Sequence, residues 1–64
     1  MQRFQLNDRV QLNTAKSFNN PTQTLNAGSK GTIIQLFADN LRYRVKFDSR
    51  IKQSIIMDPD LSKG

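Results

Sequence analysis

The chain has 64 residues and a formal net charge of +5, and it contains neither cysteine nor histidine. This composition excludes disulfides, thiolate nucleophiles and imidazole bases, and it removes the commonest ligands of transition metals. We therefore expect a single domain over residues 1–64 that holds no metal and no cofactor. No apolar run reaches the roughly 20 residues of a membrane-spanning helix, and residues 1–6 lack the apolar core of a signal peptide. We expect a cytoplasmic protein without a membrane span.

The positive charge is concentrated in one stretch. Residues 42–52 contain five basic residues and one aspartate, and so hold +4 of the net +5. A local positive field of this kind favours acidic partners. A charged face that serves only solubility is the alternative.

The N-terminal part predicts one short strand. Residues 4–6 alternate between apolar and polar types and end at the turn pair Asn7-Asp8. Residues 9–12 alternate again, which places Val10 and Leu12 inward.

A long polar connection over residues 13–30 follows, with turn signals at 19–21 and 26–28. We expect Phe18 and Leu25 to attach it to the core. A loop of this length is often functional, although a plain surface excursion is equally open. The glycine-rich stretch 28–31 is no phosphate loop, because β-branched residues typical of a strand follow it instead of a helix.

Two strands joined by a turn at 38–40 form the centre of the chain, one over 31–37 and one over 41–47. The second strand alternates without interruption, which is typical of a sheet with one packed face and one solvated face. Its inward set is Leu41, Tyr43, Val45 and Phe47, and its outward set is Arg42, Arg44 and Lys46.

The C-terminal part predicts a turn at 48–50, a strand over 51–57 and one helical turn over 58–61. Asp58 is the expected N-cap of that turn, Pro59 its first helical residue, and Leu61 a core residue. Cation binding by the two aspartates is the less economical alternative.

Alternation also predicts which side chains form the core. The expected core is Val10, Leu12, Ile34, Leu36, Leu41, Tyr43, Val45, Phe47, Ile55 and Leu61, closed by Phe4, Leu6 or Leu25. Ile33, Phe37 and Ile56 fall on the opposite strand faces. If they are exposed, they form with Phe18 an apolar interface beside the basic residues.

Three stretches resemble the small SH3-like barrels: residues 4–10 their opening strand, 28–34 their Gly-x-x-Gly-Thr-Val/Ile segment, and 43–48 their third strand. The resemblance implies an all-β barrel of four to five strands with a long first loop and a short C-terminal helical turn. Similar barrels include the KOW-type domains, photosystem I subunit IV, the ferredoxin–thioredoxin reductase variable chain and the NDH-complex S subunit. They also include type II dihydrofolate reductases, whose Val-Gln-Ile-Tyr stretch is not matched at 53–56.

Two functions remain open for this non-catalytic domain. The first is nucleic-acid binding, because alternate residues of a strand recur about every 6.6 Å, close to the phosphate spacing of a single strand. The second is an accessory or adaptor subunit that docks on an acidic protein. Both functions use the same basic residues, which are Arg42, Arg44, Lys46, Arg50, Lys52 and Lys30. Exposed strand edges leave a homodimer open as well.

Overall fold

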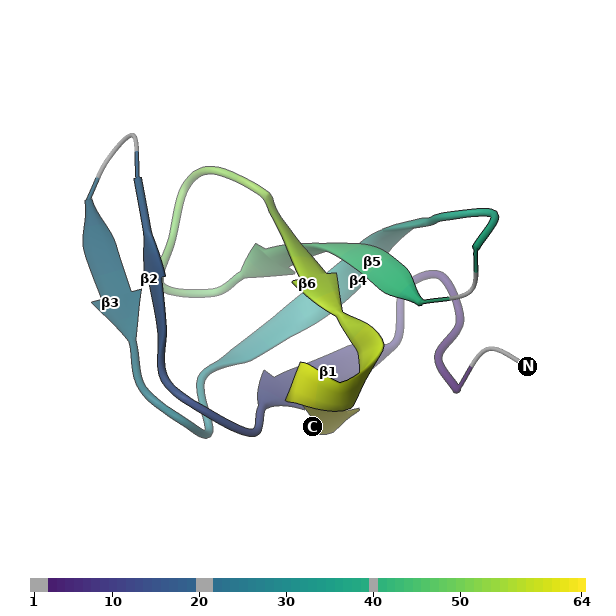
Figure 1. Cartoon of the computed structure of the whole chain (residues 1–64), viewed down its shortest axis with the longest axis horizontal. Helices are drawn as coiled ribbons and strands as arrows, with labels where there is room; N and C mark the ends of the chain where they lie inside the picture. Colours follow the sequence, from purple (N-terminus) through teal and green to yellow (C-terminus); the bar gives the residue numbers. More distant parts are fainter. Residues whose placement is uncertain (1–2, 20–21, 40) are drawn as a thin grey trace.

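The computed structural model describes residues 3–19, 22–39 and 41–64, and these residues form seven short strands and one 3₁₀ turn. The elements are β1 (Arg9–Leu12), β2 (Lys16–Phe18), β3 (Gln23–Leu25), β4 (Lys30–Leu36), β5 (Arg42–Phe47), β6 (Ser54–Met57), η1 (Asp58–Asp60) and β7 (Leu61–Lys63). Five strands form one antiparallel sheet in the order β6-β5-β4-β1-β7, and β2 pairs with β3 in a separate hairpin (Figure 1). The predicted all-β class is confirmed.

Strand β5 lies inside the sheet between β4 and β6, as its alternating sequence indicates. Tyr43, Val45 and Phe47 are completely buried, so the predicted inward set is confirmed for these three residues. Leu41 precedes the strand and is 55% exposed, so its predicted core position is wrong.

Strand β4 contains a bulge that decides which isoleucine is buried. Its register against β5 shifts between Ile33 and Gln35, which leaves Ile34 without an opposite residue. A bulge lets residues three apart face the same side, and here Ile33 and Leu36 both face the core. Ile33 is fully buried and Ile34 only partly buried. The predicted core position of Ile34 is wrong, because strict alternation fails at the bulge, and Ile33, whose exposure was left open, is buried.

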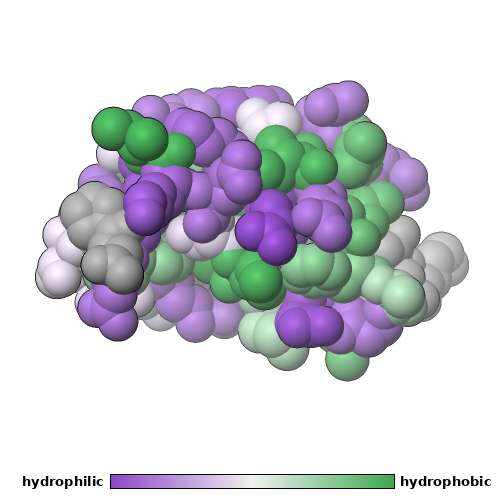
Figure 2. Space-filling view, turned by 90° about the horizontal axis from the view of Figure 1, so that it is seen from above, coloured by the Kyte–Doolittle hydropathy of each residue, from purple (hydrophilic) through white to green (hydrophobic). Residues whose placement is uncertain are grey.

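Strand β6 is shorter than predicted and turns its other face to the core. Antiparallel pairing sets Ile56 opposite the buried Tyr43, and directly opposed residues share a face. Ile56 is therefore buried, whereas Ile55 is 48% and Met57 46% exposed. The expectation that Ile55 is in the core is wrong, and Ile56, whose exposure was left open, takes the core position. From above, hydrophobic side chains are visible among hydrophilic ones (Figure 2).

The predicted long connection is a hairpin instead of a loop. Strands β2 and β3 pair antiparallel, and the Ser17 and Thr24 hydroxyls lie 3.1 Å apart. The hairpin is attached where expected, since Leu25 is buried in the core and Phe18 packs against it. Residues 20 and 21 of the predicted turn at 19–21 lie outside the described residues, and so does Asn40 of the predicted turn at 38–40.

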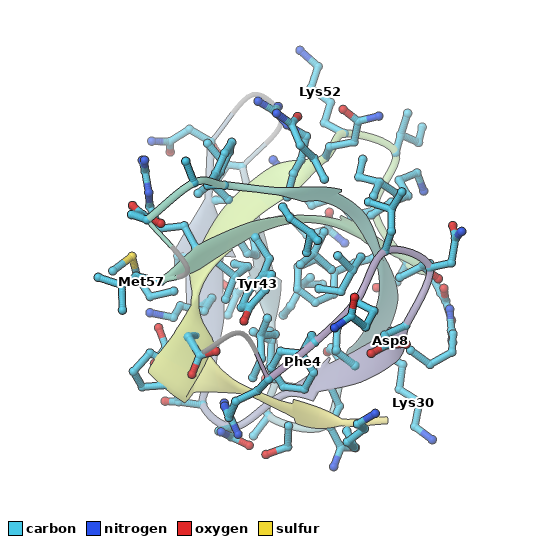
Figure 3. All side chains as sticks on the ribbon, turned by 90° about the vertical axis from the view of Figure 1, so that its right-hand side faces the viewer. Phe4, Asp8, Lys30, Tyr43, Lys52 and Met57 are labelled. Carbon is cyan, nitrogen blue, oxygen red and sulfur yellow. The ribbon has the colours of Figure 1, made fainter. Side chains whose placement is uncertain are left out.

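The N-terminal segment closes one end of the core. Phe4 is buried and meets Tyr43 edge to face, with ring centroids 5.3 Å apart (Figure 3). Of the three residues named as alternatives for closing the core, Phe4 and Leu25 are buried and Leu6 is exposed. Asn7 has a φ of 72° and donates its N–H to the Ile33 carbonyl. Asparagine is one of the few residues that adopts this left-handed conformation at low cost.

The predicted helical turn is η1, and Leu61 after it is fully buried as expected. Met57 is the N-cap of η1, so Asp58, the predicted N-cap, is instead its first residue and Pro59 its second. The Asp58 carboxylate accepts hydrogen bonds from Arg3 Nε at 2.8 Å and from the Tyr43 hydroxyl at 2.7 Å. The pKa of Tyr43 is raised, mainly because the hydroxyl is shielded from solvent and secondly because it donates to Asp58. The chain then forms β7, a very short strand that pairs with β1 at the edge of the five-stranded sheet.

Candidate functional site

The outward side chains of β5 form a row of three cations, as predicted from the sequence. Arg42 is exposed, and Arg44 and Lys46 are partly buried. Each of the three has different neighbours, and these neighbours decide how much of the row is available to a ligand.

Arg42 is the member of the row that an acid neutralises. Its Nε donates to Asp39 Oδ2 at 2.9 Å, and its guanidinium lies 4.8 Å from the centre of the Phe37 ring. The N–H of Leu41 and the bond from Arg42 hold the pKa of Asp39 below its usual value. Asp39 therefore stays ionised near neutral pH and offsets much of the charge of Arg42.

Arg44 retains most of its hydrogen-bonding capacity. Its Nε donates to Gln35 Oε1 at 2.9 Å, and its guanidinium lies 5.9 Å from the centre of the Phe37 ring. A guanidinium has five N–H donors. The four on the two Nη atoms make no hydrogen bond within the part of the chain that the structure describes. Neutral Gln35 and Phe37 thus hold the side chain in place without cancelling its charge.

Lys46 is held by neutral groups as well. Its ammonium donates to the backbone carbonyls of Arg50 at 2.7 Å and Phe47 at 3.1 Å. These bonds occupy two of its three donors, and since carbonyls carry no net charge the positive charge of Lys46 remains.

Lys30 joins the same face from β4. Lys30 shares its strand face with Thr32, and Thr32 pairs with Lys46 of β5. The backbone carbonyl of Lys30 accepts a hydrogen bond from the Asp48 N–H. Arg9 donates to Asp48 Oδ1 at 2.9 Å, and this hydrogen bond is the main reason why the pKa of Asp48 is lowered. The charges of Lys46 and Lys30 lower the pKa of Asp48 further. Three cations from three strands therefore surround one carboxylate.

The ion pairs of the molecule show where its excess charge lies. All five aspartates pair with a basic side chain. The basic residues in these pairs are Arg3, Arg9, Lys16, Arg42 and Lys63. Among the described residues, the basic side chains that make no ion pair with an aspartate include Lys30, Arg44, Lys46 and Lys52. We name Lys30, Arg44 and Lys46 the cationic face, because they share the outer side of β4 and β5.

Three of the six predicted contact residues are not part of this face, and one of them is Arg42, which pairs with Asp39. Arg50 is buried, so its predicted role as an exposed contact is wrong. Its guanidinium lies 4.8 Å from the centre of the Phe18 ring and donates to the Asn19 carbonyl at 2.9 Å. Arg50 therefore fixes the β2–β3 hairpin to the β5–β6 connection. Lys52 is exposed in that connection but extends away from Lys30 (Figure 3).

The residues of the predicted apolar interface are not exposed together, and other apolar side chains are exposed instead. Ile33 and Ile56 are buried and cannot contribute, while Phe18 and Phe37 are partly buried beneath arginines. The exposed apolar side chains near the arginines are instead Leu41, Ile55 and Met57. Cross-strand pairing sets Ile55 opposite Arg44 and Met57 opposite Arg42. Sequence reasoning missed Ile55 and Met57 because it placed the wrong face of β6 inward, and it missed Leu41 because it extended the alternation of β5 to a residue before that strand.

The described residues contain no group of three or more potential metal-ligating His, Cys, Asp or Glu side chains, and no pocket opens among them. None of the helical structure in those residues is long and apolar enough to cross a membrane. Comparison with protein-family models, curated proteins and solved structures finds no match for this chain.

Proposed function

We propose that the protein is a non-catalytic nucleic-acid-binding module that contacts the phosphate backbone through the cationic face. One observation carries this proposal. Each aspartate forms its ion pair with another cation, so among the described residues Lys30, Arg44 and Lys46, on adjacent strands, form no ion pair with an aspartate. Lysine and arginine contacts of this kind give affinity without sequence readout, and that affinity weakens as salt rises.

Arg44 is the central contact of the proposed site. Its two Nη groups present a fork that matches two phosphate oxygens, and its bond to Gln35 holds that fork in place. Lys46 lies two residues along the same strand and Lys30 on the neighbouring strand, so both add charge on one side of Arg44. The resemblance to SH3-like barrels, which include nucleic-acid-contacting KOW-type domains, is consistent with this use of a sheet surface.

The test measures the affinity of a fluorescein-labelled single-stranded oligonucleotide by fluorescence anisotropy. We expect Arg44→Gln to weaken binding several-fold. Lys63→Gln, which removes the same charge from β7, should weaken it much less. Equal losses in the two variants would mean that only net charge matters and would contradict a site on the cationic face.

An acidic protein partner is the second candidate, and the exposed apolar residues favour it. Leu41, Ile55 and Met57 lie beside Arg42 and Arg44, and arginine and methionine are enriched in the centres of protein interfaces. In this case the chain is an accessory subunit of a larger complex. Capture of a partner from cell extract that survives nuclease but is lost at high salt supports this candidate, whereas loss after nuclease supports nucleic acid.

A further inference from the structure

Strand β6 forms one edge of the five-stranded sheet and pairs only with β5 among the described residues. Edge strands expose backbone N–H and C=O groups that can accept a further strand. Natural proteins commonly protect such edges with charges, prolines or a covering element. Along β6 itself the sequence is Ser-Ile-Ile-Met, which has none of these protecting residues.

The pairing of β6 identifies the backbone groups that face outward from the sheet. The Asp58 N–H donates to the carbonyl of Leu41, the residue before β5, at 2.7 Å. Antiparallel strands bond through alternate residues, so Ile56 shares the orientation of Asp58 and bonds toward β5. The N–H and C=O groups of Ile55 and Met57 must then point away from β5, to the open edge. No turn or loop of the described chain bonds to them.

The side chains along this edge combine apolar surface with positive charge. Ile55 and Met57 are about half-exposed, and Ile51, three residues before the strand in the β5–β6 connection, is 89% exposed. Arg44 lies opposite Ile55, and Lys52 follows Ile51. Neither Arg44 nor Lys52 is among the basic residues that pair with the aspartates. An added strand would meet apolar contacts and cationic charge together.

We propose that β6 accepts an extended peptide segment with acidic side chains at alternate positions, which adds to the sheet by backbone hydrogen bonds to Ile55 and Met57. Charge complementarity selects this occupant. A second copy of the chain would bring another net charge of +5 and its own Arg44, which lies opposite Ile55, so like charges oppose self-pairing. This inference goes beyond the proposed nucleic-acid binding, which uses the side chains of β4 and β5 and no backbone group of β6.

The probe is a fluorescein-labelled Glu-Val-Glu-Val-Glu-Val peptide, with Lys-Val-Lys-Val-Lys-Val as the charge control. We expect the acidic peptide to bind and the basic one not to bind. Ile55→Pro removes an edge-facing N–H while sparing the bonds to β5, and should weaken peptide binding about tenfold. Ile55→Thr retains the N–H and should weaken binding less. Equal binding of the two peptides, or unchanged binding by Ile55→Pro, would overturn the proposal.

A test on the peptide side avoids any question about folding of the proline variant. N-methyl groups on alternate residues block one edge of the peptide strand, and shifting them by one residue blocks the other edge. Binding through one edge requires that one methylation pattern abolish binding and the other spare it, whereas equal effects would contradict strand addition. Concentration-dependent dimerisation through β6 without peptide binding would also contradict the proposal. Oligonucleotide binding that persists in Ile55→Pro separates this inference from the proposed function.

Discussion

The two neighbouring isoleucines of β6 allow a direct comparison of buried and exposed positions. Ile56 is 3% exposed and faces Tyr43 across the strand pair, whereas Ile55 is 48% exposed on the outer face. Conversion of each to valine removes one methylene and preserves β-branching. The variants thus differ only in the side of the sheet on which the methylene is lost.

The expected costs follow from burial. Ile56→Val removes a packed methylene and should lower the free energy of unfolding by about 0.5–1.5 kcal/mol. Ile55→Val removes a methylene that is half in water and should change it by less than about 0.5 kcal/mol. A domain of this length has a total stability of roughly 3–10 kcal/mol, so both variants should remain folded.

Thermal unfolding followed by far-ultraviolet circular dichroism measures the difference. In a domain of this size about 1 kcal/mol shifts the Tm by roughly 4–8 °C, so Ile56→Val should melt several degrees below the wild type and Ile55→Val close to it. Urea titration should show the same order through the transition midpoints. A larger loss in Ile55→Val than in Ile56→Val would refute the register of β6 against β5.

Three further predictions concern close packing, a partly buried hydrogen bond and acid stability. Gly31→Ala places a methyl group 2.8 Å from the Lys46 carbonyl oxygen, so β4 and β5 must separate, and urea titration should show a loss of about 1–3 kcal/mol. Tyr43→Phe leaves the Asp58 carboxylate without its hydroxyl donor and should lower the free energy of unfolding by about 1 kcal/mol, again by urea titration. The pKa of Asp48 is lowered in the folded state, so its contribution to stability is present above its ordinary pKa near 4 and is lost as pH falls through the lowered value. Tm measured from pH 5 to pH 2 should therefore fall more in the wild type than in Asp48→Asn.

The sequence predicted the elements whose pattern is local. Residues 9–12 and 43–47 alternate without a break, and both form strands with the expected face buried. Pro59 after an aspartate indicated a helical turn, and η1 is found there. In each case a few adjacent residues contain all of the information.

The errors arose where a distant strand decides the outcome. In β4 the bulge at Ile34 reverses the alternation, and its position depends on the pairing with β5. In β6 both faces carry large apolar residues, so only the pairing with Tyr43 shows that Ile56 faces the core. Strands β2 and β3 have three residues each and mostly polar sequences, so they are too short for hydrophobic alternation to predict them.

The composition of the basic site was also predicted only in part, because the sequence does not show which distant segments pack together. Charge counting and alternation selected Arg44, Lys46 and Lys30, and all three lie on the outer side of β4 and β5. They also selected Arg50, whose burial depends on Phe18 and Asn19 from a hairpin that the sequence did not reveal.

The salt dependence of oligonucleotide affinity tests the central claim most directly. If Lys30, Arg44 and Lys46 each neutralise one phosphate, the plot of log affinity against log salt should have a slope of about −2 for a single strand. Arg44→Gln should reduce the steepness of that slope by about 0.7, while Lys63→Gln should leave it nearly unchanged. An affinity that does not depend on salt, or a slope that Arg44→Gln leaves unaltered, would contradict phosphate binding by the cationic face.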